Sequence, residues 1–357
     1  MRFIVGDHHR KICEALDKVV RGEIKRLIIN IAPRYGKTEL VSKNFIAYGL
    51  ALNPRSKFIH LSYSDDLVLD NSKEINETVQ SDYYQRLFPE VVVESKNAKK
   101  WYTSVGGGLY AVSAAGQVTG FGAGQVNDPY RERREMGDFI PAWESDFAGA
   151  IVIDDPIKPE DALSETIRER VNNRFESTIR NRVNSRNTPI IIIMQRLHEH
   201  DLCGYLQEIE PEEWTVLSLP CIWHDENGQE QPLWEFKHTL EELHKIERSN
   251  SFVFETQYMQ NPKPLEGLMY GEFKTYDIIP YAASMKRKNY TDTADTGSDY
   301  LCSICYTETP IGNFVTDILY TSRQQPRCWP ETRRRSATSR ATMAAGLSGA
   351  MLRRSAE

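Results

Sequence analysis

The sequence lacks any long apolar segment. A membrane-spanning helix needs about 20 consecutive apolar residues, and no run within the 357 residues approaches that length. The first seven residues, MRFIVGD, also lack the regions that make up a secretory signal. We therefore expect a cytoplasmic protein that makes no contact with a membrane.

The sequence is also poor in cysteine motifs. Its six cysteines are scattered, and only Cys302 and Cys305 form a C-x-x-C pair. A structural zinc site needs a second pair of ligands, and residues three apart on a strand point to opposite faces, so we interpret this pair as structural. Disulfides are not expected in the cytoplasm.

Residues 322–357 lack Ile, Val, Phe, Tyr, Lys and Asp altogether. Their eight arginines and two glutamates give this tail a charge of +6, although the whole chain carries −6. Such a composition cannot supply core strands, so we predict a disordered tail, and the abrupt change favours a shift of reading frame near residue 322. The net negative charge argues against a constitutive polyanion binder but allows transient contact with DNA through a local surface.

The first two-thirds of the chain alternates strand-like and helix-like patterns, which predicts an α/β fold with a mostly parallel sheet. Two of the apolar runs are continuous, as in central strands that are covered on both faces. Apolar residues spaced by four between Ile167 and Val183 predict one amphipathic helix. The buried-strand candidates are residues 27–31, 58–62, 109–112, 150–153 and 190–194.

The patterns divide the chain into four regions. Residues 1–207 form the α/β domain, and residues 208–287, rich in Pro, Trp and Glu, are interpreted as a subdomain and connector. A new strand-like pattern in residues 288–321 begins another domain, and the arginine-rich tail follows it.

The strongest motif follows the first predicted strand. Gly36-Lys37-Thr38 lies between that strand and a helical pattern, which is the setting of a Walker A motif, although Ile31 replaces the usual first glycine. The loop and the helix N-terminus would hold the phosphates of ATP, Lys37 would reach the β- and γ-phosphates, and Thr38 would bind Mg²⁺. The predicted nucleotide-binding residues of this segment are Pro33, Arg34, Tyr35, Gly36, Lys37, Thr38 and Glu39.

Two further strands end in polar residues. The apolar run at 150–153 is followed by Asp154 and Asp155, which is the pattern of a Walker B motif. Asp154 would hold the Mg²⁺ shell, and Asp155 would orient or deprotonate the attacking water. The strand at 190–194 leads into Gln195, at the sheet edge where ligands bind in open α/β sheets, so a polar residue there can sense the γ-phosphate. Together these motifs predict a P-loop ATPase of the RecA-like kind.

Several longer segments make the chain resemble the large subunit of a tailed-phage terminase. The two most specific are Met194-Gln195-Arg196-Leu197-His198 and the nine residues FETQYMQNP at 254–262. The other segments of the resemblance, in chain order, are 32–39, 61–64, 116–120 and 153–156, and it extends from residue 8 to about residue 320.

The resemblance implies a homo-oligomeric ring on a capsid portal that pumps double-stranded viral DNA inward with ATP, in the host cytoplasm. The portal protein and the terminase small subunit are the implied partners. In this family an arginine of the Walker A loop acts as a finger in cis, which assigns that role to Arg34, and the segment after the later strand couples hydrolysis to movement, which assigns that role to Gln195 and Arg196.

The resemblance also implies a C-terminal nuclease with an RNase H-like fold that uses Mg²⁺ or Mn²⁺. Its first metal ligand would be Asp292, on the first strand of that domain, with Asp295 and Asp299 as weaker candidates and Asp317 as an ordinary strand residue. A two-metal site needs several converging carboxylates, and the tail offers almost none, so we expect an incomplete domain and impaired cleavage.

Three alternatives stay open at this point. The arginines between Arg168 and Arg186 could contact DNA or a neighbouring subunit, but a solvated helix face paired with glutamates is favoured. A helicase-like DNA-remodelling ATPase would share the Walker motifs. An inactive prophage remnant with only an assembly role is the third possibility.

Overall fold

The computed structural model divides into two compact units, Met1–Pro264 and Leu265–Glu357. It describes residues 4–95, 97–114, 116, 120–124, 147–263, 274–279, 286–292, 301–321 and 350–353. Several predicted features therefore lie outside the described residues, namely 117–119, Asp295, Asp299, the tail at 322–349 and 354–357, and the side chain of Asp292. No helix within the described ranges is long and apolar enough to cross a bilayer.

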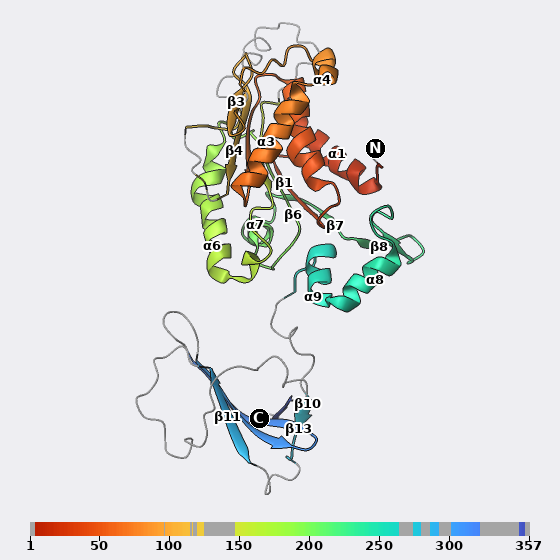
Figure 1. The fold of residues 1–357 in the computed structure, drawn as a ribbon, viewed down its shortest axis with the longest axis vertical. Helices are drawn as coiled ribbons and strands as arrows, with labels where there is room; N and C mark the ends of the chain where they lie inside the picture. The colour runs from red at the N-terminus through yellow and green to blue at the C-terminus, as the bar shows by residue number, and fades with distance from the viewer. Residues whose placement is uncertain are drawn as a thin grey trace. The chain divides into compact units, whose positions relative to one another are not determined.

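A seven-stranded sheet forms the centre of the first unit (Figure 1). Its strand order is β3-β4-β2-β5-β6-β1-β7, and every pair is parallel except β3–β4. The strands are β1 (Arg26–Ile31), β2 (Lys57–Ser62), β3 (Lys100–Tyr102), β4 (Gly108–Ser113), β5 (Ile151–Asp154), β6 (Ile190–Met194) and β7 (Thr215–Leu219).

Helices cover both faces of this sheet, with α1 and α3 on one side and α6 on the other (Figure 1). Successive residues of β1 pack into different cores, because Ile29 joins the cluster with the α1 side chains and Ile28 joins the cluster with the α6 side. The helical elements are α1 (Asp7–Val20), η1 (Thr38–Asn44), α2 (Phe45–Leu52), α3 (Asp65–Val79), α4 (Asp82–Leu87), η2 (Asp161–Leu163), α6 (Glu165–Arg174), η3 (Phe175–Ile179), η4 (Arg180–Arg182) and α7 (Leu202–Ile209).

All five predicted strands are present in the sheet, with bounds that differ by one residue at most. The predicted helix after β5 is not a single α-helix, because α6 continues as the π-helical η3 and the short 3₁₀ turn η4. An α-helix has 3.6 residues per turn, so apolar residues spaced strictly by four drift around its surface. The wider turn of the π-helix η3 corrects this drift and keeps Phe175 and Ile179 buried in the core.

The region expected as a connector belongs largely to the first unit. β7 completes the central sheet beside β1, and the compact unit extends to Pro264 rather than ending near residue 207. β7 was not predicted because only Leu219 of its five residues is buried, and the strand therefore has no continuous apolar run. The remaining elements are β8 (Ile222–His224), β9 (Glu230–Pro232), α8 (Leu240–Ser249), α9 (Ser251–Val253) and η5 (Phe254–Tyr258).

The described strands of the second unit form a five-stranded sheet in the order β10-β14-β13-β12-β11. β11, β12 and β13 are antiparallel neighbours, and they lie in the region where the strand-like pattern from residue 288 predicted strands. The prediction of a tail without strands differs from the structure, in which β14 lies between β10 and β13. The strands are β10 (Lys274–Tyr276), β11 (Arg287–Asp292), β12 (Leu301–Thr309), β13 (Gly312–Thr321) and β14 (Ala350–Arg353).

Candidate nucleotide-binding site

The loop between β1 and η1 has an unusual backbone. Arg34 and Gly36 both adopt left-handed conformations, with φ of 66° and 82°. At Gly36 a side chain would be strained by this φ and would also meet the His9 ring, because an added Cβ would lie 2.9 Å from Nε2. A non-glycine residue at positive φ costs about 1–3 kcal/mol and is typical of functional loops.

Buried aromatic and histidine side chains support this loop from behind. The Tyr35 side chain is fully buried, and its hydroxyl lies 3.0 Å from Nδ1 of His238. The Tyr35 carbonyl accepts a hydrogen bond of 3.2 Å from Nε2 of His8, and Trp234 packs edge-on against both His8 and His9. Residues from the N-terminal helix and from the region after β9 therefore support the loop, and no local sequence pattern indicates this role for His8 or His9.

His8 is a neutral packing residue in this arrangement. Burial lowers the pKa of His8 from 6.5 to about 4, and the adjacent His9 acts in the same direction. The pKa of His9 is lowered too, again by burial. Neither ring therefore supplies positive charge for phosphate binding at neutral pH.

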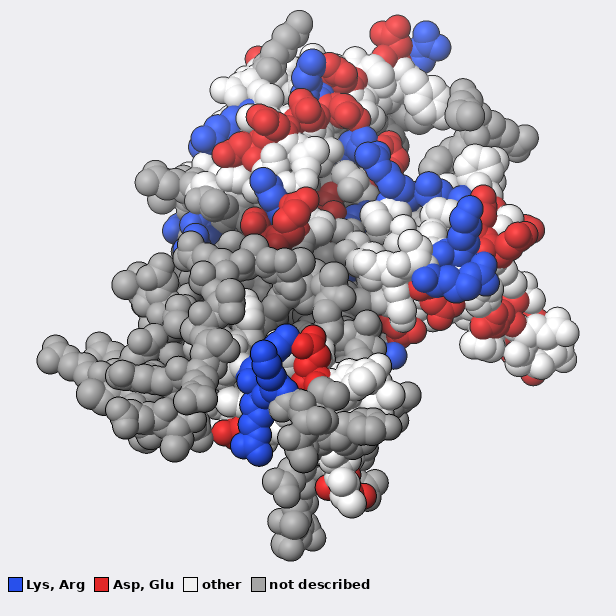
Figure 2. Space-filling model, turned by 60° about the horizontal axis from the view of Figure 1, so that its bottom comes forward, with Lys and Arg blue, Asp and Glu red and all other residues white. Residues whose placement is uncertain are grey.

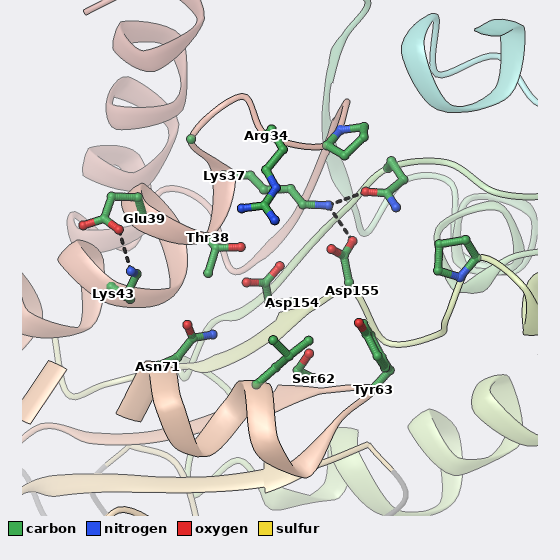
Figure 3. Close-up of a pocket in the computed structure, with 15 residues that line it drawn as sticks. Arg34, Lys37, Thr38, Glu39, Lys43, Ser62, Tyr63, Asn71, Asp154 and Asp155 are labelled. Atoms are coloured by element: carbon green, nitrogen blue, oxygen red, sulfur yellow. Dashed lines mark hydrogen bonds and ion pairs between the residues drawn. The ribbon is translucent and has the colours of Figure 1, made fainter. Parts of the chain in front are cut away.

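Lys37 connects the loop to two other strand ends. Its Nζ lies 2.6 Å from Oδ1 of Asp155 and 2.6 Å from Oε1 of Gln195, and its side chain is only 6% exposed (Figure 3). The carboxyl ends of β1, β5 and β6 are adjacent in the sheet, which explains how these three residues meet.

Asp154 and Asp155 have different surroundings. Oδ2 of Asp154 accepts a hydrogen bond of 2.8 Å from the buried Ser42 hydroxyl, whereas its buried Oδ1 has no hydrogen-bond partner among the described residues. Burial raises the pKa of Asp155, the Lys37 ammonium opposes that rise, and the charge of Asp154 adds to it. An unpartnered buried carboxylate oxygen is costly unless a ligand satisfies it.

These residues line a cavity of about 600 Å³ (Figure 3). That volume lies within the range of small-molecule sites. Of the predicted residues, the cavity is lined by Pro33, Arg34, Gly36, Lys37, Thr38, Glu39, Asp154, Asp155 and Gln195. The other lining residues, which were not predicted as site residues, are Lys43, Ser62, Tyr63, Leu67, Asn71 and Pro159.

Charged side chains mark two edges of the cavity. The Arg34 guanidinium points into it from the loop (Figure 3). Glu39 lies 2.6 Å from the Lys43 ammonium, which also pairs at 2.6 Å with Glu74 of α3. Glu39 is therefore engaged in an ion-pair network that joins η1 to α3, in addition to lining the cavity.

Two predicted residues do not line the cavity. Tyr35 is buried behind the loop, and Arg196 is turned toward Asp201, whose two carboxylate oxygens lie 3.0 Å from its Nε. The Asp201 carboxylate also accepts the backbone N–H of Gly204 at the start of α7, at 2.9 Å, and that of Leu197 in the preceding loop, at 2.9 Å. Arg196 thus closes the loop between β6 and α7, and its own backbone N–H donates to Oε1 of Gln260 at 3.0 Å.

Two arginines of the α6 region have different protein partners. Arg168 donates to the Ala162 carbonyl at 2.8 Å, and Arg180 pairs with Glu176 and with Glu210 at 2.5 and 2.8 Å. On the face drawn in Figure 2, basic and acidic side chains are interspersed among the described residues. Arg180 is therefore paired with glutamates, as the favoured interpretation expects, whereas Arg168 is buried rather than solvated and contacts a backbone carbonyl.

Asp292, the candidate nuclease ligand, is the last residue of β11. The backbone of Asp292 pairs with that of Cys302 in the antiparallel strand β12. Within the ranges that the structure describes, no group of three or more His, Cys, Asp or Glu side chains could hold a metal ion. The role of Asp292 therefore stays a prediction.

No family model and no curated protein matches the chain. Among solved structures, the large terminase of bacteriophage HK97 matches with 13% identity and a TM-score of 0.44, over 90% of this chain and 63% of that one. The large terminase of a thermophilic bacteriophage, in complex with ATP-gamma-S, matches with 11% identity and a TM-score of 0.38, over 86% of this chain and 67% of that one. The chain spans less than two-thirds of the HK97 protein, at 63% of its length.

Proposed function

We propose that this chain is a Mg²⁺-dependent ATPase that acts as the motor of a terminase large subunit. The observation that carries the proposal is the convergence of Lys37, Asp154, Asp155 and Gln195 in one cavity next to a loop of Walker A sequence. These residues lie at or beyond the carboxyl ends of three different strands, so a chance Gly-Lys-Thr sequence does not account for their meeting.

Lys37 changes partners when ATP binds. In the structure its ammonium is neutralised by Asp155 and donates a hydrogen bond to Gln195. The β- and γ-phosphates would take over this charge, with the backbone N–H groups at the start of η1 as further donors. Release of Lys37 leaves the Asp155 carboxylate and the Gln195 amide to face the terminal phosphate.

The cavity also contains a suitable set of oxygens for Mg²⁺. Thr38 lines the cavity, and the buried Oδ1 of Asp154 has no protein hydrogen-bond donor among the described residues, while Ser42 fixes the other oxygen of that carboxylate. Oxygen ligands are those that Mg²⁺ prefers. When bound, the ion would neutralise the charge that develops on the phosphate oxygens.

Asp155 would serve as the base for hydrolysis. A water attacks the γ-phosphorus and gives one proton to the Asp155 carboxylate, while the bond to the bridging oxygen of ADP breaks and that oxygen takes the electron pair. The Gln195 amide would orient this water or the γ-phosphate. Arg34, which points into the cavity, would stabilise negative charge on the transferring group.

The wider role rests on the resemblance of the sequence segments. We propose that the motor moves double-stranded DNA into a capsid as a ring on the portal protein, with a small subunit as partner. A helicase-like remodeller is less favoured, because the described strands of the second unit do not form a second parallel α/β sheet. Cleavage of plasmid DNA with Mn²⁺ that Asp292→Ala abolishes would support the nuclease role.

The deciding experiment measures ATP hydrolysis with Mg²⁺, in the presence and absence of DNA. The Lys37→Ala variant loses two short contacts of a charged group and should lose about 10²-fold or more of its turnover. Lys73→Ala is the matched control, because Lys73 lies on α3 with a side chain that is 69% exposed. Equal turnover in the two variants would refute the proposal.

A further inference from the structure

Asn71 of α3 lines the nucleotide cavity and contacts a buried histidine on its other side. Its Nδ2 lies 3.3 Å from Nε2 of His60, which is fully buried in β2. Nδ1 of His60 lies 3.3 Å from the carbonyl oxygen of Val152 in the neighbouring strand β5. The histidine therefore lies between a backbone carbonyl and a cavity-lining amide.

These two contacts define the hydrogens of the histidine ring. A carbonyl oxygen only accepts, so Nδ1 of His60 must carry the hydrogen that it donates to Val152. A fully buried imidazole with no carboxylate beside it in these contacts is neutral, because burial disfavours the charged form. Nε2 is consequently a bare acceptor.

The orientation of the Asn71 amide follows from this. An acceptor at Nε2 requires the NH₂ group of Asn71 on that side, because a carbonyl oxygen there would face a lone pair. The amide oxygen is therefore turned away from His60. Figure 3 shows the Asn71 amide directed into the cavity, toward the side where Thr38 and Asp154 lie.

We propose that Oδ1 of Asn71 is a further oxygen of the Mg²⁺ site, which accepts a hydrogen bond from a water bound to the ion, and that His60 is the residue that positions it. This inference rests on the proposed ATPase function. The amide oxygen can only accept hydrogen bonds, so it repels phosphate oxygens but can accept a hydrogen bond from a metal-bound water. Mg²⁺ retains several such waters in protein sites. The buried, unpartnered Oδ1 of Asp154 places the ion on the same side of the cavity.

The test measures equilibrium binding of a fluorescent ATP analogue to the full chain at increasing Mg²⁺ and, separately, in EDTA. Asn71→Leu keeps the size of the side chain but removes the acceptor. Loss of such an outer contact typically weakens metal binding by about 10-fold or more. We expect the Mg²⁺ concentration at half-maximal binding to rise about 10-fold, with unchanged affinity in EDTA. Lys73→Leu, at an exposed site of the same helix, should change neither value.

His60→Phe tests the positioning role. Phenylalanine fills a similar volume and offers no acceptor, so the amide can turn, and we expect a smaller rise in the required Mg²⁺ with the same affinity in EDTA. A folding defect would appear in circular dichroism, in which case Asn71→Leu alone decides.

Two outcomes would overturn the inference. Equal losses with Mg²⁺ and with EDTA for Asn71→Leu would mean a direct contact with the nucleotide or a general structural role. An unchanged Mg²⁺ requirement would mean that the amide does not meet the ion's hydration shell. Failure of the ATPase proposal is distinguishable, because the wild-type chain would then show no Mg²⁺-dependent binding of nucleotide.

Discussion

Asp155→Asn should have opposite effects on the binding and the hydrolysis of ATP. The substitution keeps the shape of the side chain and replaces a carboxylate by an amide. It also suits the backbone, because Asp155 has a φ of 45° and asparagine tolerates the left-handed region better than most residues. The effects of this variant should therefore come from the lost charge rather than from a distorted turn.

Hydrolysis should slow markedly. An amide cannot take the proton of the attacking water, and removal of a general base typically costs about 10²–10⁴-fold in rate. That range corresponds to about 3–5 kcal/mol in the activation free energy. Asp154 keeps its contact with Ser42, so the proposed Mg²⁺ site should persist in the variant.

Binding of ATP should become tighter. In the free protein the Lys37 ammonium must leave Asp155, from which it is separated by 2.6 Å, before it can reach the phosphates. A hydrogen bond to a charged acceptor is stronger than one to a neutral acceptor by about 1 kcal/mol, so Lys37 leaves an amide more easily and affinity should rise about 5-fold. The variant also removes the repulsion between Asp155 and the γ-phosphate, which acts in the same direction.

The assay combines titration of a fluorescent ATP analogue with single-turnover hydrolysis at the same Mg²⁺ concentration. Tighter binding together with turnover reduced by at least about 10²-fold is the expected result. The reasoning is refuted if the variant turns over ATP within threefold of the wild-type rate. If the variant bound the ATP analogue tenfold more weakly than the wild type, the proposal that Lys37 moves from Asp155 to the phosphates would be contradicted as well.

Three further predictions concern the supports of the site. Tyr35→Phe removes the hydroxyl contact with His238 and should lower the free energy of unfolding by about 1 kcal/mol in urea denaturation, with a slower ATPase. Gln260→Ala leaves the backbone N–H of Arg196 without its acceptor, so ATP turnover should fall while an ATP analogue still binds. The pKa of His8 is lowered from 6.5 to about 4 in the folded protein, so between pH 6.5 and pH 4 the unfolded chain protonates His8 more readily than the folded chain does. The free energy of unfolding should therefore fall by about 2–3 kcal/mol as the pH is lowered from 6.5 to 4. Urea titrations at several pH values should show a flatter dependence for His8→Leu.

The central strands could be predicted because their own residues determine their burial. β6 consists of four isoleucines and a methionine, and each of them is fully buried. β7 depends instead on its neighbour, since its backbone pairs with β1 while its side chains remain mostly exposed. A strand that is defined by pairing rather than by apolar content leaves no pattern in the sequence.

Motifs at strand ends could be predicted for a similar reason. Lys37, Asp155 and Gln195 each follow a recognisable strand, and parallel strands bring their carboxyl ends to one edge of the sheet. Asn71 could not be found in this way, because its role depends on a contact between α3 and the interior of β2. The support of Tyr35 by His238 joins residues 203 positions apart, and no local spacing encodes it.

The two adjacent pairs at the strand ends show how backbone conformation decides which polar residue enters the site. Successive residues of an extended chain point to opposite sides, so Gln195 reaches Lys37 whereas Arg196 turns away to Asp201. Asp154 and Asp155 would be separated in the same way if the chain stayed extended. The left-handed turn at Asp155, with φ of 45°, ends that alternation and lets both carboxylates line the cavity. The strain of that turn, about 1–3 kcal/mol, therefore holds side by side the two carboxylates that we propose as Mg²⁺ ligand and base, one at the end of β5 and one directly after it.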